Sequence, residues 1–275
     1  MSTTQSLVEF FSQMVTAQKG ESWEPEGKAS WVDVIRRLMA VGVVGAVIVV
    51  LLYVKAKLHY TFHWTVLVSF KQAYWMGFLM TMKLSVVTLF CSIIVGGLVG
   101  LASVSRRICL RDLATAYVEG IRNIPLLVIV LLMYFGVGTL FHLPRFPAAV
   151  IALTAFESTF FAEIIRGGIE SIATGQMWAG RSLGLSSGMT MTYIILPQAV
   201  RRVVPALAGQ FVNLVKDSSL ASVISLVELT LIGRQIMTAT FAAFESYIAI
   251  AVFYFSVCFT LSLLTKILEK KIPVE

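Results

Sequence analysis

Charged and amide side chains occur inside segments that are otherwise apolar, and these are the residues that could do chemistry. Gln210, Asn213 and Asp217 follow one another at i, i+3 and i+7, the spacing of one helix face, and Lys216 lies beside them. Glu157 lies in another apolar run. A charge in the middle of a bilayer costs on the order of 2.5–3.5 kcal/mol, so such groups usually face a bundle interior or a water path. The pattern predicts that these residues line the central interface of a helix bundle or a translocation path.

A second charged pair, Glu163 and Arg166, lies three residues apart farther along the run that holds Glu157. This spacing lets the two side chains pair across one helical turn. Such a pair has two interpretations, a structural ion pair that anchors the helix or a gate on the path. Lys216 and Asp217 have a similar alternative, because they could bind each other and backbone carbonyls instead of a solute.

The possible enzymatic and metal-binding motifs lack the neighbouring residues or elements that their chemistry needs. The segment 184–188 matches GxSxG, but that motif needs a preceding strand and a histidine within reach, and the three histidines are predicted on the other side of a membrane. His59 and His63 stand at i, i+4, yet Tyr60 occupies the position where a zinc protease needs Glu. The three cysteines show no CxxC spacing. We expect no catalytic residue and no metal ligand in this chain.

The composition indicates that lipid is the solvent. Of the 275 residues, 57% are hydrophobic and 13% are charged, against roughly 25% charged in a soluble domain. The net charge of +7 could suggest nucleic acid, but the basic residues cluster at the ends of apolar runs. That placement is typical of membrane orientation and argues against a nucleic-acid partner.

Six apolar segments of roughly 20 residues are long enough to cross the hydrocarbon core. They are residues 38–54, 77–104, 125–140, 147–165, 203–226 and 246–268. A basic loop is predicted before the third. In the second segment Ser92, Gly96 and Gly100 recur every four residues, which predicts close approach of a neighbouring helix.

The distribution of positive charge predicts the orientation. Six spans place both termini on one side of the membrane. Of the 22 Lys and Arg residues, 15 fall on the side of the termini, five fall opposite and two lie within the spans. Because basic residues concentrate in cytoplasmic loops, both termini and the 175–198 segment are expected in the cytoplasm.

The segment 175–198, GQMWAGRSLGLSSGMTMTYIILPQ, is polar enough for water but lies between apolar spans. Gly184 falls midway, and Leu196-Pro197 closes the run. A short amphipathic helix broken by glycine and stopped by proline is poor as a spanning element. It is suited to docking on a partner at the membrane surface.

This segment resembles the cytoplasmic loop of the membrane subunits of binding-protein-dependent ABC importers, which is patterned as Glu-Ala-Ala, three residues, Gly, nine residues, Ile, one residue, Leu-Pro. The matching positions here are Ala179, Gly180, Gly184, Ile194, Leu196 and Pro197. Trp178 stands where the family usually has Glu, which weakens any transfer of that acid's contact with the ATPase. The resemblance implies that Gln176, Trp178, Ala179, Gly180, Gly184, Leu196 and Pro197 belong to a loop that couples to an ATPase.

The resemblance extends over about residues 75–270. WMGFLMTMKLSVV, AYVEGIRNIPLLV, FFAEIIRGGIESI and NLVKDSSLASVIS are similar to the polar-amino-acid branch of these permeases. It implies an all-α polytopic membrane bundle with the type I ABC importer permease fold, a five-helix core plus one extra N-terminal span. The expected organisation is a polar cytoplasmic tail at 1–30, an extra helix and periplasmic linker at 31–74, and the transporter domain at 75–270.

The resemblance also implies the function and the partners. The chain would be the permease of an ATP-driven importer of a polar amino acid, and positive charge near the path favours glutamate, aspartate or glutamine. A separate ATPase dimer would hold ATP and Mg, since this chain has no GxxxxGK[ST] phosphate loop and would bind no cofactor. A substrate-binding protein and a second permease chain, identical or homologous, would complete the assembly in a bacterial cytoplasmic membrane.

Three alternatives remain at the level of sequence. An ion-coupled secondary transporter would need no ATPase, but such folds usually contain internal repeats, and none is found between the halves. A membrane enzyme would need a nucleophile and base within the spans. An ABC importer for another small polar solute differs only in its cargo.

Overall fold

The computed structural model describes residues 60–271 continuously and six isolated helical positions between 39 and 53. The chain divides into two units at Thr61 and Phe62, and the second unit carries the site described below. The predicted tail at 1–30 and most of the predicted span at 38–54 lie outside the described residues.

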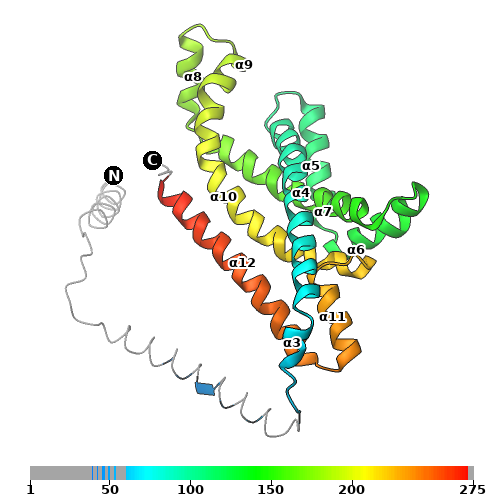
Figure 1. Ribbon diagram of the computed structural model, residues 1–275. Helices are drawn as coiled ribbons and strands as arrows, with labels where there is room; N and C mark the ends of the chain where they lie inside the picture. The colour runs from blue at the N-terminus through cyan, green and yellow to red at the C-terminus, as the bar shows by residue number, and fades with distance from the viewer. Residues whose placement is uncertain are drawn as a thin grey trace, which may run out of the picture. The chain divides into compact units, whose positions relative to one another are not determined.

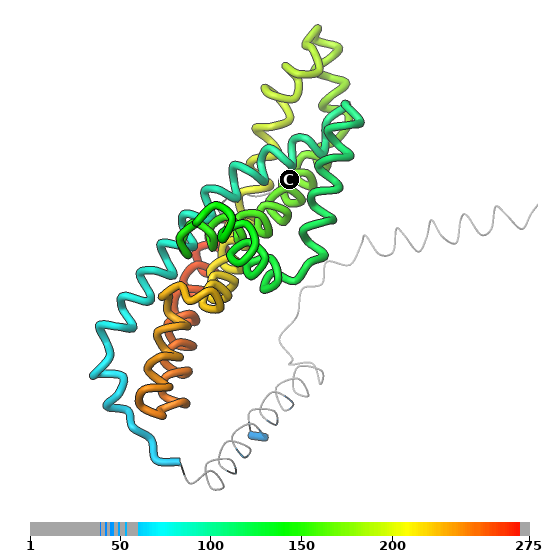
Figure 2. Tube along the Cα trace, turned by 90° about the vertical axis from the view of Figure 1, so that its right-hand side faces the viewer, coloured from blue at the N-terminus to red at the C-terminus, as the bar shows by residue number. Residues whose placement is uncertain are grey.

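Every regular element between residues 60 and 271 is helical. Figures 1 and 2 show the long helices running beside one another, with α8 and α9 at one end of this unit and α3 and α11 at the other. The elements are α3 Thr65–Ser69, α4 Lys71–Ser103, α5 Ile108–Arg122, α6 Leu126–Leu131, η1 Leu132–Gly138, α7 Arg145–Glu170, α8 Thr174–Ser182, α9 Ser187–Thr190, η2 Met191–Ile195, α10 Leu196–Asp217, η3 Ser218–Ile224, α11 Leu229–Thr240 and α12 Ala243–Lys271.

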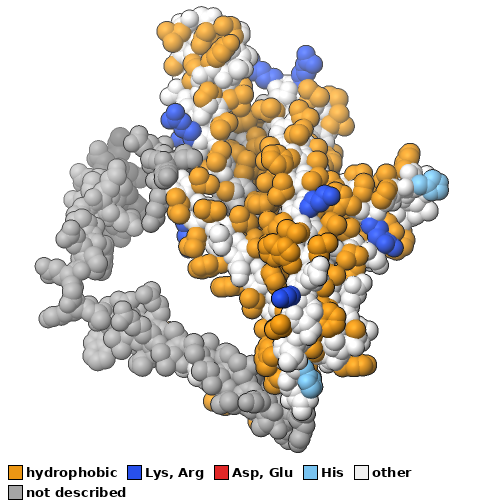
Figure 3. Space-filling model, viewed as in Figure 1, with side chains coloured by type: hydrophobic (Ala, Val, Ile, Leu, Met, Phe, Trp, Pro, Cys, Tyr) orange, Lys and Arg blue, Asp and Glu red, His pale blue; other side chains and the backbone are white. Residues whose placement is uncertain are grey.

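Three of these helices, α4, α7 and α12, are long and apolar enough to cross a membrane by themselves. Two further spans arise if each bent pair counts as one: α5 with α6 and η1, bent by 98°, and α9 to η3 with α11, bent by 51°. The described residues thus hold three spans, or up to five, at the places where the sequence predicts the second to sixth. Hydrophobic side chains cover most of the face seen in Figure 3, as a lipid-facing surface requires.

Two connections differ from the sequence-based expectation. The predicted basic loop before the third span is mostly the helix α5. Its Ala114 and Val118 are buried at i, i+4, while Arg111 and Arg122 are exposed, so charge and helical periodicity coexist there. The second difference is α11, a 12-residue helix before the sixth span that the sequence analysis did not predict.

The most extensive helix contact in the described unit joins α4 to α7, and small residues make it possible. Ser92, Gly96 and Gly100 are all buried, which confirms the predicted small-residue face. A Cβ atom on Gly96 would lie 2.5 Å from the Cβ of Phe161 and 2.9 Å from the carbonyl oxygen of Ser158. The two backbones therefore touch with no room for a side chain.

The end of the amphipathic segment also differs from expectation. Leu196 and Pro197 do not close a helical run but begin α10, with Pro197 in the first turn. Proline is tolerated there because the first N–H groups of a helix have no intrahelical partner. The chain continues from η2 into α10 without a loop.

Candidate functional site

A buried carboxylate lies at the centre of the predicted solute path. The Glu157 side chain is 0% exposed on α7, and its Oε2 accepts a hydrogen bond from Gln210 Nε2 on α10 at 3.0 Å. Asn213 Nδ2 donates to Gln210 Oε1 at 3.1 Å, so three predicted residues form one chain of contacts. Asp217 lies beside the Glu157 carboxyl. We call these four residues the central cluster.

The central cluster has unused bonding capacity. Glu157 Oε1 is buried and accepts no hydrogen bond from any described donor. A buried carboxylate oxygen without a donor is costly, because burial removes the water that would satisfy it. Lys216 and Asn213 are exposed and Asp217 is half-buried, so the cluster runs from a buried end to an open one. Direct contact of these residues with a solute stays a prediction.

The predicted pair of Glu163 and Arg166 is not formed. Glu163 pairs with Arg122 of α5, and Arg166 pairs with Glu170 at 3.1 Å on its own helix. The i, i+4 spacing of Arg166 and Glu170 places the two groups on one helix face, and Arg122 reaches Glu163 because α5 packs on α7. The ion pairs thus join α5 to α7 and stiffen the last turns of α7.

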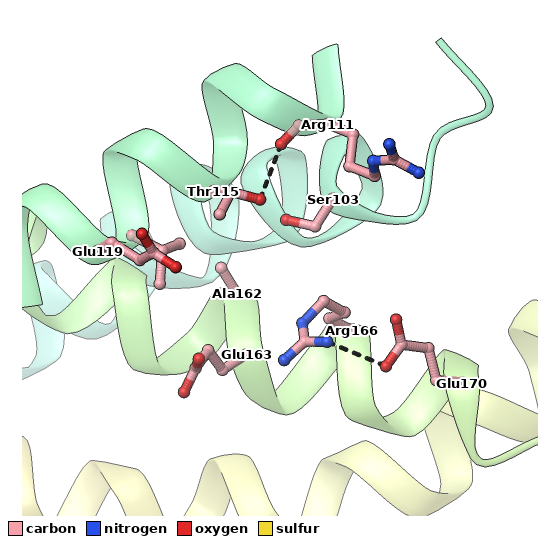
Figure 4. A pocket seen from close by; sticks show the side chains of 9 residues that line it. Ser103, Arg111, Thr115, Glu119, Ala162, Glu163, Arg166 and Glu170 are labelled. Atoms are coloured by element: carbon pink, nitrogen blue, oxygen red, sulfur yellow. Dashed lines mark hydrogen bonds and ion pairs between the residues drawn. The ribbon is translucent and has the colours of Figure 1, made fainter. Parts of the chain in front are cut away.

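These ion pairs border a cavity of about 300 Å³ at the α8 end of the bundle, which we call the terminal pocket (Figure 4). It is enclosed by the last turn of α4, by α5 and by the end of α7. Its lining residues are Ser103, Arg111, Thr115, Val118, Glu119, Ala162, Glu163, Arg166 and Glu170. Charged side chains of both signs therefore surround one hollow.

The predicted coupling segment folds as α8, a turn, α9 and η2. Gly184 makes the turn with φ of 85°, a left-handed conformation that favours glycine. Ser186 caps α9 by accepting a hydrogen bond from Met189 N at 3.2 Å. Gly180 is buried, and a Cβ there would meet Thr190 Cγ2 at 2.6 Å, so α8 lies directly against α9.

Several large side chains of this segment are exposed, whereas Thr190 and Ile195 are buried. Trp178 is 69% exposed, Leu183 79% and Tyr193 71%. Gln176, Ala179 and Pro197 are also exposed, and Leu196 is half-buried. Large apolar side chains that are exposed together at one end of the molecule mark an interaction surface. We call residues 174–195 the projecting segment.

Sequence reasoning missed two buried carboxylates. Glu228 is 0% exposed, and its carboxyl caps α11 by accepting hydrogen bonds from the Thr230 and Leu231 N–H groups, both at 2.8 Å. Tyr254 OH of α12 donates to it at 3.1 Å, and Thr81 Oγ1 of α4 lies at 3.4 Å. One carboxylate thus joins three helices. The sequence signal that could have identified Glu228 is the position of this acidic residue just after the predicted fifth span.

The second missed carboxylate is Glu245, also 0% exposed, whose Oε1 accepts a hydrogen bond from His63 N. It lies in the first turn of α12, at the end opposite α8. Within residues 60–271, no group of three or more His, Cys, Asp or Glu side chains could hold a metal ion.

The chain resembles known proteins over most of its length. Residues 92–274 match the family model described as the binding-protein-dependent transport system inner membrane component. The probable glutamine ABC transporter permease protein GlnM of Bacillus subtilis (strain 168) is 41% identical over 197 residues, 71% of this chain and 91% of that protein. The probable glutamine ABC transporter permease protein GlnP of the same strain is 40% identical over 200 residues, 71% and 91%.

The folds agree as well. A crystal structure of an amino acid ABC transporter with histidines superposes with a TM-score of 0.72 at 36% sequence identity. The match covers 77% of this chain and 100% of the other. Residues 92–274, which match the family model, hold the central cluster, the terminal pocket and the projecting segment.

Proposed function

The chain belongs to the family of binding-protein-dependent transport system inner membrane components, and from this membership we propose that it imports a polar amino acid of the glutamate, aspartate or glutamine type. It is a multi-pass permease of the inner membrane with the type I importer fold. The single observation that supports this choice of substrate is the similarity, at 41% and 40% identity, to two proteins named as probable glutamine permeases.

ATP hydrolysis by a partner would drive transport through the projecting segment. The Trp178 and Leu183 side chains are exposed on and just after α8, and Gly184 turns the chain so that α9 packs against α8. We propose that these two side chains insert into a groove on a separate ATPase subunit, which holds ATP and Mg. Insertion buries their apolar surface, at about 25 cal/mol per Å² removed from water. We propose that the projecting segment and both termini lie in the cytoplasm, the side that the charge distribution of the sequence favours.

The cargo would pass the central cluster. Because α7 and α10 contribute Glu157 and Gln210 respectively, movement of one helix against the other changes the hydrogen bond between them. The unsatisfied Glu157 oxygen offers an acceptor to the ammonium group of an amino acid, and the exposed Asn213 offers an amide to its polar side chain. We propose that ATP binding on the partner switches the access of this cluster between the two sides.

A second permease chain is needed to enclose the path, because Asn213 and Lys216 are exposed on the cluster's open side. A polar face inside a bilayer must meet protein or a water-filled cavity. GlnM and GlnP of one strain are both similar to this chain, which supports pairing with either an identical or a homologous copy. A substrate-binding protein would deliver the amino acid on the side of α3 and α11.

Two measurements on one preparation test this function. The chain is purified from native membranes in mild detergent, the accompanying proteins are identified by mass spectrometry, and uptake of labelled L-glutamine is measured in proteoliposomes. We expect an ATPase subunit in the wild-type sample and its loss with Gly184→Val, because a β-branched residue is strained at the positive φ of this turn. Gly188→Val is the matched control, since nothing lies within 4 Å of a Cβ there and its φ is ordinary.

The outcomes separate the parts of the proposal. Absence of an ATPase from every wild-type preparation refutes ATP-driven import and favours ion-coupled transport. Recovery of the ATPase without ATP-dependent uptake of glutamine, glutamate or aspartate refutes the cargo alone.

A further inference from the structure

A lysine interrupts the apolar surface of α4. Lys83 is exposed on this helix, 12 residues after Lys71, which is about 18 Å along the axis at 1.5 Å per residue. Its ammonium group lies over the ring of Phe146, in the first turn of α7, at 5.1 Å from the ring centre. A ring face attracts a cation but does not neutralise its charge. None of the ion pairs in the described part of the chain includes Lys83.

A second cation without a counter-ion begins α7. Arg145 is the first residue of that helix, and its side chain is exposed. The ion pairs found among residues 60–271 do not include it either. Because Phe146 follows Arg145 directly and carries the Lys83 ammonium on its ring, both cations lie at the level of the first turn of α7. Two helices thus bring positive charge to one place.

Beside Arg145 the surface is hollowed by a groove of about 470 Å³, which we call the lateral groove. It lies between α4, η1, the start of α7 and the break between η3 and α11. Its lining residues are Met80, Tyr134, Leu143, Pro144, Arg145, Ser225, Leu226 and Val227. Met80 precedes Lys83 by three residues, so the two share one face of α4. Six of the eight lining residues are apolar or aromatic, and most of the wall therefore suits hydrocarbon.

The polar groups of the lateral groove can all donate to an anion. The hydroxyl groups of Tyr134 and Ser225 have no hydrogen-bond partner in the described part of the chain, and each can donate one bond. No acidic residue lines the groove. Glu228 is close in sequence, but it is 0% exposed and its carboxyl accepts hydrogen bonds from the N–H groups of Thr230 and Leu231. The groove therefore combines positive charge with free donors.

The membrane setting selects the occupant. α7 is long and apolar enough to cross a bilayer, and Arg145 is its first residue, so the two cations lie near the headgroup level of one leaflet. Figure 3 shows basic side chains among hydrophobic ones on a largely apolar face. A soluble protein that docks at the α3 end would have to reach about 18 Å along α4 to contact Lys83. A phospholipid brings a phosphate and an acyl chain to this level by itself.

We propose that the lateral groove binds an anionic phospholipid. The phosphate makes charge-assisted contacts with Lys83 and Arg145, and an acyl chain follows the apolar wall. A zwitterionic lipid binds less well, because its ammonium group meets the same two cations. The bound lipid connects α4 and α7 to the break after η3, where the chain bends by 51° into α11, and so stabilises that bend. The site requires a membrane but no particular cargo.

The test measures lipid binding to the importer in the assembly in which it purifies. The assembly is delipidated in detergent and titrated with dioleoyl-phosphatidylglycerol, and native mass spectrometry follows binding of the first lipid. Dioleoyl-phosphatidylethanolamine, which is zwitterionic, is the reference and should bind more weakly. Lys83→Gln and Arg145→Gln should each weaken phosphatidylglycerol binding about fivefold, the factor that corresponds to about 1 kcal/mol per basic residue near a lipid surface. The double variant should lose about 25-fold, the product of the two factors.

A control on the same helix separates this site from a general effect of charge. Lys71→Gln removes an exposed lysine about 18 Å away along α4 and should leave phosphatidylglycerol binding unchanged. Melting temperatures without added lipid verify that all variants fold. Added phosphatidylglycerol should then raise the melting temperature of the wild type and of Lys71→Gln, but not that of the double variant.

Three results would overturn the lipid site. The first is equal affinity of the wild type for the two lipids, and the second is unchanged phosphatidylglycerol binding in the double variant. The third is that the substitutions dissociate a second permease chain, or release a substrate-binding protein, while lipid binding persists, which would assign the groove to a protein contact. The proposed function stands or falls separately, since it is tested by recovery of the ATPase and by glutamine uptake.

Discussion

Two regions of the same unit differ in how far their apolar side chains are buried. One is the contact between α4 and α7, and the other is the projecting segment. Between α4 and α7, Gly96 lets two backbones touch, and Leu153 and Phe161 on α7 are 0% exposed. In the projecting segment the largest apolar side chains are the most exposed, with Leu183 at 79%. In the first region, the apolar side chains are buried against other residues of the same chain. The second leaves large apolar side chains exposed.

This difference separates residues that stabilise the fold from residues that, in the proposed function, bind another chain. Substitutions in the α4–α7 contact should change the stability of the chain, whereas substitutions in the projecting segment should change its association. Each variant below is measured both ways, by melting temperature in detergent and by recovery of the ATPase.

The largest effect is expected from Gly96→Leu. The new side chain would start at a Cβ that is already 2.5 Å from Phe161 and would have to separate α4 from α7. Overpacking a core typically costs about 1–3 kcal/mol, and contact with a backbone carbonyl raises the cost further. We expect no monodisperse protein in fluorescence-detected size exclusion. Gly97→Leu, one residue on with nothing within 4 Å, should behave as the wild type.

Glu228→Ala should be next. Removing the carboxyl leaves the N–H groups of Thr230 and Leu231 and the hydroxyl of Tyr254 without their acceptor. An unsatisfied buried donor costs about 1–3 kcal/mol, so the variant should lose at least about 3 kcal/mol of stability. Thermal unfolding in detergent measures this. Tyr254→Phe removes one of these contacts and should lose about a third as much; equal losses would contradict the three-helix role of Glu228.

Leu183→Arg should weaken association by about 2 kcal/mol, the loss typical of a central apolar anchor, which is about 30-fold in affinity. Quantitative mass spectrometry of the co-purified ATPase measures it, and the melting temperature should not change because Leu183 is exposed. Phe241→Arg makes the same change at an 85% exposed residue at the opposite end and should retain the ATPase. If Leu183→Arg unfolds the chain instead, the contrast between the two regions is wrong.

The smallest effect is expected from Arg122→Gln. The ion pair with Glu163 joins α5 to α7 but both side chains are partly exposed, at 43% and 36%. Exposed ion pairs contribute about 0–1 kcal/mol, so the melting temperature should fall by only a few degrees. A large loss would show that α5 depends on this pair and not on the burial of Ala114 and Val118.

Periodicity and composition predicted the spans and the small-residue face because both depend on residues that are close in sequence. Ser92, Gly96 and Gly100 repeat every four residues, and α4 buries all three. The stripe of Gln210, Asn213 and Asp217 does lie on one helix, α10. The resemblance to importer permeases supplied the fold and the projecting segment, which no periodicity could have assigned to a partner.

The features that were missed depend on residues far apart in sequence. Glu228 contacts Thr81, which lies 147 positions away in the sequence. Glu163 pairs with Arg122 and not with Arg166, because α5 packs against α7. The 98° bend between α5 and α6 was also not predictable. Pro125 indicates where a helix begins, but the angle to the preceding helix is set by what α6 packs against.

The π-helical segment η2, Met191–Ile195, carries a further consequence for the spacing between Gly184 and Leu196. A wider turn absorbs one more residue than an α-helical turn would. A deletion in an α-helical stretch rotates everything on its N-terminal side by about 100°, since an α-helix advances 360° in 3.6 residues. A deletion in η2 would instead convert the wide turn into an ordinary α-helical turn, and the α8 surface would keep its direction relative to α10. The π-helical turn therefore lets the spacing between Gly184 and Leu196 lose one residue without re-aiming Trp178 and Leu183, whereas a second deletion would rotate them.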